Sequence, residues 1–223
     1  MIDFVELRRG MVDAQVRAND VTDHRIVGAM LEIPREKFVP APLKSLAYID
    51  DDLIIRPAQG RTPARYLVEP MVVARLIQLA DVQEKDHVLD IGAGTGYTAA
   101  VLSRLAQQVV ALEEDAELAA AATKTLAELG VDNVAVMQGP LVAGWPAEAD
   151  YDVIFVNGAV DLIPPTLFGQ LKEGGRLVTV FGQGGAGQAR LYTKVSGQVS
   201  EWPAFNAAVP RLPGFEAAPR FVF

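Results

Sequence analysis

Hydrophobic and polar positions divide the chain into two parts near Gln83. Before this residue, apolar positions recur with helical spacing and are interrupted by prolines. After it, apolar stretches of strand length alternate with helical stretches. Such alternation predicts a parallel sheet with both faces covered. We therefore expect a doubly wound, mostly parallel α/β core at residues 83–223, preceded by a cap of helices and loops at residues 1–82.

The first part is helical with one irregular segment. Pro34 and Pro40 interrupt it, and Thr22 or Asp23 can cap a helix. Residues 50–66 contain three acids, two prolines and a glycine, and are expected to form an irregular loop. Helices are predicted at about 4–19, 22–32 and 68–80, the last with Pro70 in its first turn.

In the second part, Gly130 closes a strongly helical stretch and is its expected C-terminal cap. Residues 189–223 are expected to add further strands with proline-rich breaks. The other predicted strands are 87–91, 108–113, 133–138, 151–158 and 174–182, with helices at about 97–105, 115–130 and 165–171.

Composition restricts the classes of function. The 223 residues carry a net charge of −8 and no cysteine. The acidic balance argues against nucleic acid as a partner, and the lack of cysteine excludes disulfides, thiolate catalysis and cysteine-based metal sites. No apolar stretch of about 18 residues predicts a membrane helix, and the first residues are not typical of a signal peptide. We expect a cytoplasmic protein without membrane partners.

The most informative stretch joins a predicted strand to a predicted helix through Gly92, Ala93, Gly94 and Gly96, shortly after Asp90. Glycine lets the backbone turn tightly and lets a ligand approach without contact from a Cβ atom. The helix that follows presents amide N–H groups to an anionic group. Ligands of open α/β sheets bind beyond the carboxyl ends of the strands. The stretch therefore predicts a ligand site.

Two details favour S-adenosylmethionine over a dinucleotide. The glycine spacing is G-x-G-x-G rather than G-x-G-x-x-G, because position 97 is tyrosine. Asp90 favours the ammonium group of S-adenosylmethionine, whereas it would repel a pyrophosphate. Glu113 ends the next strand and can accept both ribose hydroxyls of either cofactor.

Simpler interpretations of these residues stay open at this point. The glycines can serve only a tight turn, Asp90 can be a turn or helix-cap acid, and Glu113 can be a surface acid. A nicotinamide oxidoreductase is a further alternative, which the glycine spacing disfavours.

Longer motifs extend over nearly the whole chain. They are MVDAQVR at 11–17, AMLEIPREKFVP at 29–40, EPMVVARL at 69–76, LDIGAGTGYTAAVLSRL at 89–105 and YDVIFVNGAVDLIPPTLFGQLKEGGRLVTVFG at 151–182. On these motifs the chain resembles the protein-L-isoaspartate O-methyltransferase family. The resemblance implies methylation of the free α-carboxylate of L-isoaspartyl residues in damaged proteins, with S-adenosylmethionine as donor. Since that carboxylate is already an anion, catalysis would depend on in-line alignment rather than on a strong base.

The resemblance also implies which residues bind the donor, and where the chain departs from the family. The family's serine beside the methyl donor falls on Val68 or Ala64, depending on the alignment, so no catalytic side chain is assigned. The family's aspartate facing the adenine amino group corresponds to Pro140. A different acceptor, or a non-catalytic relative, is therefore the alternative. The implied donor contacts are Asp90, Gly92, Ala93, Gly94, Gly96, Glu113, Glu114, Pro140, Leu141 and Asn157.

Three arginines, Arg56, Arg61 and Arg65, precede the predicted helix at 68–80. A guanidinium group pairs well with a carboxylate, so they can bind a substrate carboxylate. The preferred interpretation is charge balance for the acids at 50–52. Those three aspartates are not expected to bind a metal.

The remaining candidates are expected to be structural. With only His24 and His87, and no cysteine, a zinc site is not expected. His87 begins a core strand, and Tyr97 and Trp145 are interpreted as packing residues rather than residues that stack on adenine. Asp152 begins a buried strand, either as an edge acid or with a role of its own.

Overall fold

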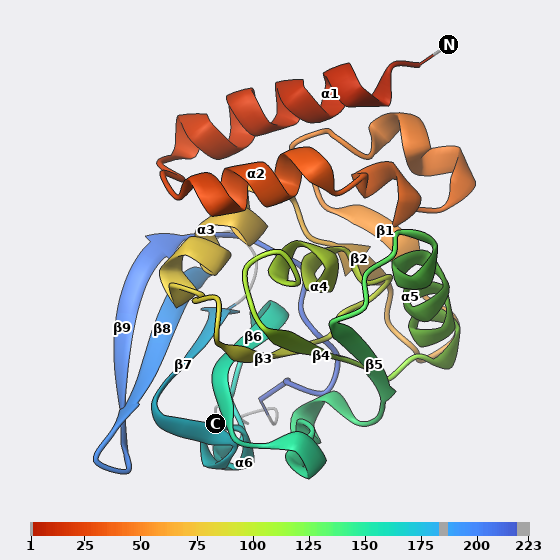
Figure 1. Ribbon diagram of the computed structural model, residues 1–223. Coiled ribbons are helices and arrows are strands. Elements are labelled where there is room, and N and C mark those ends of the chain that lie inside the picture. Colours follow the sequence, from red (N-terminus) through yellow and green to blue (C-terminus); the bar gives the residue numbers. More distant parts are fainter. Residues whose placement is uncertain (1, 183–186, 218–223) are drawn as a thin grey trace, which may run out of the picture.

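The computed structural model describes residues 2–182 and 187–217. In this part of the chain the main sheet has seven strands in the order β5-β4-β3-β6-β7-β8-β9 (Figure 1). Strands β3 to β7 pair in parallel, and β8 and β9 extend one edge in antiparallel pairing. The strands are β3 (His87–Ile91), β4 (Gln108–Glu113), β5 (Val134–Gln138), β6 (Tyr151–Val160), β7 (Leu171–Phe181), β8 (Gln188–Val195) and β9 (Gln198–Asn206). The predicted doubly wound, mostly parallel sheet is confirmed.

Each face of the sheet has its own apolar core, because successive strand side chains point to opposite faces. Val88 and Val109 belong to the core on one face, whereas Leu89 and Val110 belong to the core on the other. The first face is covered by the cap and by α3 (Pro70–Ala80), α4 (Tyr97–Leu102) and α5 (Ala116–Glu128). The second is covered by α6 (Pro165–Gly169), by the short turns Leu141–Ala143 and Pro146–Glu148, and by the segment after β9.

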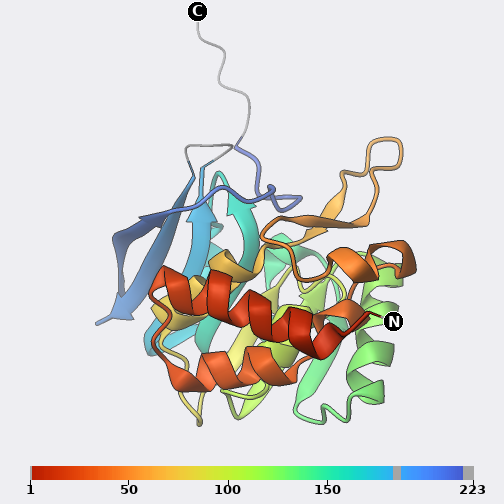
Figure 2. The ribbon, with the colours of Figure 1, turned by 90° about the horizontal axis from the view of Figure 1, so that it is seen from above.

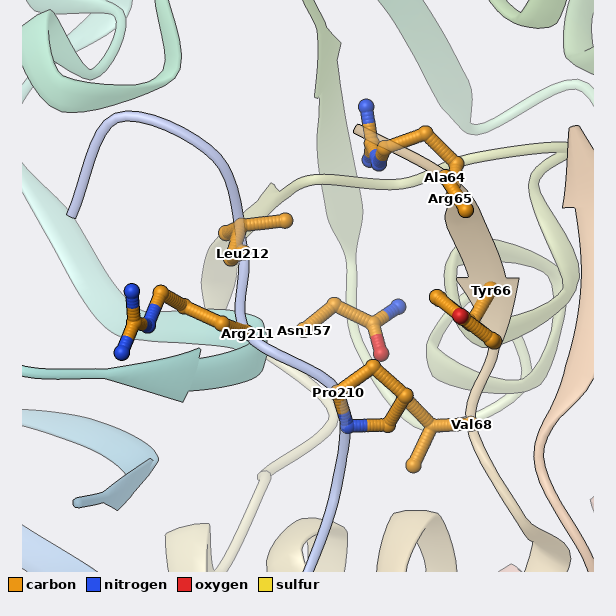
Figure 3. Close-up of a pocket in the computed structure, with 8 residues that line it drawn as sticks. All are labelled: Ala64, Arg65, Tyr66, Val68, Asn157, Pro210, Arg211 and Leu212. Carbon is orange, nitrogen blue, oxygen red and sulfur yellow. The ribbon is translucent and has the colours of Figure 1, made fainter. Parts of the chain in front are cut away.

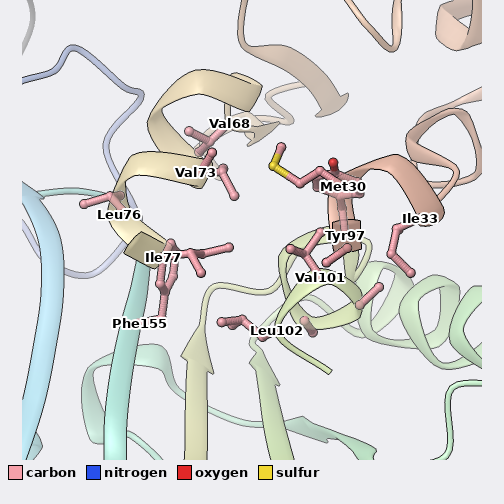
Figure 4. Packing of buried hydrophobic residues seen from close by; sticks show 14 of the residues in the cluster. Met30, Ile33, Val68, Val73, Leu76, Ile77, Tyr97, Val101, Leu102 and Phe155 are labelled. Carbon is pink, nitrogen blue, oxygen red and sulfur yellow. The ribbon is translucent and has the colours of Figure 1, made fainter. Parts of the chain in front are cut away.

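The cap consists of α1 (Phe4–Met11) and α2 (His24–Glu32), which lie side by side over α3 and α4, and of the turns Arg35–Lys37 and Ala41–Leu46 (Figures 1 and 2). Side chains at the end of α2 reach the same buried cluster as those of α3 and α4 (Figure 4). That cluster continues across the predicted boundary at residue 83 into the strands. The division of the chain at this point therefore stays a prediction.

The predicted helices are present with shorter bounds. The helix expected at 4–19 is α-helical only to Met11 and continues as a π-helical turn, Val12–Val16, and a 3-10 turn, Arg17–Asn19. Asp23, rather than Thr22, caps α2, since its side chain accepts the N–H of Arg25.

The prediction that residues 50–66 form only an irregular loop is wrong. It contains a two-stranded antiparallel hairpin of β1 (Leu53–Arg56) and β2 (Arg65–Leu67), in which Arg56 lies opposite Arg65. The strands are short, and a stretch that contains proline and glycine separates them. No local pattern in the sequence therefore predicts that they pair.

Strands β8 and β9 confirm only the first part of the expectation for 189–223. The segment after Asn206 instead runs back over the carboxyl end of β6, where a single bridge joins Ala159 and Arg211. Residues 218–223 lie outside the described part. Within that part, no helix is both long and apolar enough to cross a membrane.

Candidate functional site

Two fully buried carboxylates lie near the carboxyl ends of neighbouring strands. Asp90 is in β3 and Glu113 ends β4, and both are 0% exposed. The turn after β3 places Gly92, Gly94 and Gly96 at φ values of +80°, +57° and +94°. Side chains rarely adopt these angles, which explains the three glycines. The sheet therefore brings the predicted acids and the predicted turn together, and the interpretation of Glu113 as a surface acid is wrong.

Asp90 is an acid of this site whose carboxylate oxygens are unsatisfied. Neither of its carboxylate oxygens has a hydrogen-bond partner among the described residues. Burial, and then the charge of Glu113, raises the pKa of Asp90 to about 8, while the nearby Asn157 amide opposes the shift. A buried acid without a donor is costly. Asp90 is therefore suited to a positively charged or hydrogen-bond-donating ligand.

Glu113, in contrast, is saturated by the protein itself. Its Oε1 accepts a hydrogen bond from Nη1 of Arg65 at 2.5 Å, and its Oε2 accepts one from Nη2 at 2.8 Å. The backbone N–H groups of Gly94 and Asp115 also donate to it, at 2.8 and 2.9 Å. The oxygens expected to accept ribose hydroxyls are thus engaged by a bidentate arginine pair.

The glycine-rich turn is covered by apolar side chains from distant segments. A Cβ atom at Gly92 would lie 2.6 Å from Leu212 Cδ1, and one at Gly94 would lie 2.8 Å from Ile55 Cδ1. The N–H groups of Gly92, Ala93, Gly94 and Gly96 all donate within the chain. In this structure the protein's own side chains, Leu212 and Ile55, fill the space that the missing Cβ atoms of Gly92 and Gly94 leave.

A cavity of only about 10 Å³ remains beside Leu212, room for about one water molecule. Figure 3 shows it between β2, which carries Arg65, Tyr66 and nearby Val68, and the segment from Pro210 to Leu212, with Asn157 between them. Both positions aligned with the family's serine, Val68 and Ala64, line this cavity. Tyr66 is the lining residue that carries a hydroxyl group.

A second hollow, of about 250 Å³, is also lined by Arg65. Glu114, a predicted donor contact, lines it together with Asp115 and Arg56. Arg65 is the residue that both hollows share in their linings.

Arg56 and Arg65 are not partners of the acids at 50–52, so that prediction is wrong for both. Arg56 Nε lies 2.7 Å from Asp115 Oδ2, and Arg65 pairs with Glu113. The prediction assumed that the arginines pair with the acids nearest in sequence. The hairpin instead directs both guanidinium groups toward the end of β4. Among the described residues, no group of acids and histidines is arranged to hold a metal ion, the acids at 50–52 included.

The other predicted donor contacts are distributed unevenly. Asn157 lines the small cavity and donates to Thr98 Oγ1 at 2.8 Å. Ala93 is buried in the turn. Leu141 is buried in the apolar core on the second face, and Pro140 is exposed.

The residues expected to be structural pack against other parts of the protein. Tyr97 is fully buried beside Phe38, with ring centroids 5.6 Å apart, and Trp145 packs against the core of the second face. The His87 ring packs at a tilt against Tyr151, at the opposite end of β3 from the glycine turn, and the backbone N–H of His87 donates to Asp152 Oδ2 at 2.8 Å. Asp152 also pairs with Lys172, so it anchors the start of β6.

The donor set fits the chemistry of S-adenosylmethionine. Within residues 2–182 and 187–217, Asp90 offers a buried carboxyl group without a hydrogen-bond partner, which suits an ammonium group. Glu113 has two oxygens of the kind that accept ribose hydroxyls, although Arg65 engages both. The turn has the glycine cradle that a close ligand needs. Sequence reasoning missed Ile55 and Leu212, which lie 37 residues before and 120 residues after the turn at Gly92, so no local signal connects them to it.

A parallel sheet that ends in two buried acids and a glycine cradle defines the class of S-adenosylmethionine-dependent methyltransferases. Within this class, a sequence model of the family described as protein-L-isoaspartate(D-aspartate) O-methyltransferase matches residues 8–205. The chain belongs to this family.

Individual relatives agree. The chain is 40% identical over 189 residues to protein-L-isoaspartate O-methyltransferase 2 of Anaeromyxobacter sp., covering 85% of this chain and 74% of the relative. It is 43% identical over 175 residues to the protein-L-isoaspartate O-methyltransferase of Koribacter versatilis, covering 78% and 76%.

Solved structures show the same fold. A protein-L-isoaspartate O-methyltransferase superposes with a TM-score of 0.80 at 30% identity, covering 93% of this chain and 66% of that one. A putative enzyme of this kind from Plasmodium falciparum, in complex with S-adenosyl-L-homocysteine, superposes with a TM-score of 0.76 at 19% identity, covering 95% and 99%. At this identity the second comparison supports the fold alone.

Proposed function

We propose that the chain transfers the methyl group of S-adenosylmethionine to the carboxylate of isoaspartyl residues at the cleft between β2 and the segment 210–212. The observation that carries the proposal is Asp90, a fully buried acid with no hydrogen-bond partner in the described part of the chain, beside a second buried acid and the glycine turn. Membership of the family supports the choice of acceptor.

The proposed roles follow from position. Asp90 holds the ammonium group of the donor, and Glu113 accepts its ribose hydroxyls. When bound, S-adenosylmethionine supplies a methyl group on a positively charged sulfur, which the acceptor carboxylate oxygen takes as the carbon–sulfur bond breaks and its electron pair stays on sulfur. The chain's own contribution is orientation and exclusion of water, since an ionised carboxylate needs no base.

Tyr66 is the proposed hydroxyl donor to the acceptor. It lines the same cavity as Val68 and Ala64, where the family's serine hydroxyl is lost. A phenol there can donate a hydrogen bond to the acceptor carboxylate and help to orient it. Tyr66 lies in β2, between the two aligned positions, and would thus supply the hydroxyl from there.

The test is transfer of a labelled methyl group to two peptides that differ only in isoaspartyl or aspartyl linkage. We expect label in the isoaspartyl peptide, and at least a tenfold loss of donor affinity in Asp90→Ala and Glu113→Ala, each checked for folding by circular dichroism. Loss of one charged contact commonly costs about 1.5–3 kcal/mol, or roughly 10- to 150-fold. Unchanged donor affinity in both variants would remove the site assignment.

The small cavity favours a second candidate, a relative that keeps the fold without catalysis, because about 10 Å³ admits no nucleoside without rearrangement. Failure of the folded protein to bind S-adenosylhomocysteine under any condition would favour it. Action on damaged proteins and a cytoplasmic location remain predictions that rest on the resemblance and on composition.

A further inference from the structure

The site is covered by four side chains of the protein itself. Ile55 packs on Gly94, Leu212 packs on Gly92, Arg65 pairs with Glu113 and Arg56 pairs with Asp115. We call these four side chains, Ile55, Arg56, Arg65 and Leu212, the cover. Three of them come from the β1–β2 hairpin, and Leu212 comes from the segment after β9.

We propose that the cover is an internal lock, in which Arg65 and Leu212 occupy the positions of the donor, so that the donor binds only after both have moved. The inference rests on the proposed function, because it assumes the same donor site. It adds that the resting site is closed and that donor binding competes with contacts inside the chain.

Arg65 competes directly with the ribose. A carboxylate that can accept two ribose hydroxyls presents the same two oxygens that the guanidinium group now takes, at 2.5 and 2.8 Å. The pair is nearly dry, with side chains 5% and 0% exposed. Breaking a buried pair without a replacement is strongly unfavourable. Without a replacement donor of hydrogen bonds, Arg65 therefore leaves Glu113 in only a small fraction of the molecules.

Leu212 competes with the part of the donor above the glycine turn. It is 3% exposed, and its Cδ1 lies where even a Cβ atom at Gly92 would clash. Its backbone is tied to β6 on both sides, since Ala159 donates to Pro210 O at 2.9 Å and accepts the Leu212 N–H at 2.8 Å. The side chain is thus held over the turn by a fixed backbone rather than by chance packing.

Arg65 also borders both hollows near the predicted donor site. It lines both the 10 Å³ cavity and the 250 Å³ hollow, and the segment from Pro210 to Pro213 borders both. Pockets for drug-sized ligands have volumes of about 300–1,000 Å³. Withdrawal of Arg65, which lines both hollows and pairs with Glu113, and of Leu212, which lines the smaller one, would enlarge the space beside Glu113.

The lock makes a prediction that runs against the usual effect of mutating a binding site. If the open form is a tenth of the population or less, the apparent affinity is reduced by that fraction. Arg65→Met and Leu212→Ala should therefore bind S-adenosylhomocysteine at least tenfold more tightly than the unaltered chain, in isothermal titration calorimetry. Leu212→Ala trims the side chain and leaves both backbone hydrogen bonds in place, so it keeps the test valid if Arg65→Met does not fold.

The matched controls are the same substitutions far from the cover. Arg104→Met removes a surface pair with Glu32, 2.9 Å, and Leu7→Ala removes a side chain that is 39% exposed on α1. Neither should change the affinity. Adding Glu113→Gln to Arg65→Met should abolish most of the gain, because the freed carboxylate is then absent.

The outcomes separate the lock from the proposed function. Equal or weaker binding in both folded cover variants, with measurable binding in the unaltered chain, overturns the lock and leaves the donor site standing. No binding in any folded variant overturns the lock together with the donor site. Tighter binding supports the lock even if an isoaspartyl peptide takes up no label, in which case only the proposed acceptor fails.

Discussion

At the scale of single residues, Asp90 and Glu113 illustrate how two similar acids acquire different properties. Both are fully buried near the ends of adjacent strands. Glu113 has an arginine and two backbone N–H groups, whereas Asp90 has no hydrogen-bond partner among the described residues. The pKa of Asp90 is consequently raised to about 8, first by burial and then by the charge of Glu113. At neutral pH Asp90 is mostly protonated before a ligand arrives.

This predicts a proton release on donor binding. An ammonium group beside Asp90 favours its ionised form and lowers its pKa. At pH 7, binding of S-adenosylhomocysteine should therefore release close to one proton, measured from titration enthalpies in buffers of different ionisation enthalpy. Asp90→Asn should release none and bind more weakly. A proton count near zero in the unaltered chain would show that Asp90 does not face the ammonium group.

The ion-pair partner of Arg65 could not be predicted from the residues around it in the sequence. The sequence identified three arginines near a set of aspartates, and charge balance between them was the simplest interpretation. The hairpin places Arg65 against Glu113, 48 residues further along, instead. Partner choice for a long side chain depends on which backbone segments meet, and local charge patterns do not contain that information.

At the scale of elements, the glycine turn serves the packing of helices as well as the site. Gly96 precedes α4 at φ +94°, and a Cβ atom there would lie 3.2 Å from Ala122 Cβ on α5. The glycine thus permits both the backbone angle and the close approach of α5.

Gly96→Ala should therefore destabilise the fold by about 1–3 kcal/mol, from strain in an unfavourable backbone region together with contact against α5. Urea unfolding followed by circular dichroism measures the change. Gly28→Ala is the matched control, because Gly28 lies within α2, has no positive φ and has nothing within 4 Å of an added Cβ atom. Alanine there should be neutral or stabilising by up to about 1 kcal/mol. Equal effects at both positions would contradict the role of the turn.

At the scale of the whole molecule, burial of acids links stability to pH. Burial is the main cause that raises the pKa of Asp52 to about 6, of Glu69 to about 7 and of Asp90 to about 8. Each folded-state pKa lies above its unfolded value, so the folded state binds more protons between the two values. Their contribution to stability is complete below about pH 4 and is lost as the pH rises through 6 to 8.

The free energy of unfolding should therefore fall between about pH 5 and pH 8, as measured by urea unfolding at several pH values. Asp90→Asn should flatten the upper part of this decline, since each unit of pKa difference corresponds to about 1.4 kcal/mol. An identical slope in the variant would show that Asp90 does not titrate as its burial implies.

The sequence by itself determined the class of fold and singled out the two acids that we propose bind the donor. Strand and helix periodicities are local, and so is the spacing of Asp90 and three glycines, so the parallel core and its ligand turn could be predicted. The family motifs gave the acceptor class in the same way.

Only the tertiary structure decided the state of the site. The β1–β2 hairpin, the Arg65–Glu113 pair and the packing of Leu212 on Gly92 all join segments far apart in the chain. Such contacts depend on how the segments 53–67 and 207–217 cross the ends of the strands. No periodicity or spacing encodes that crossing, and it leaves the predicted turn covered instead of open.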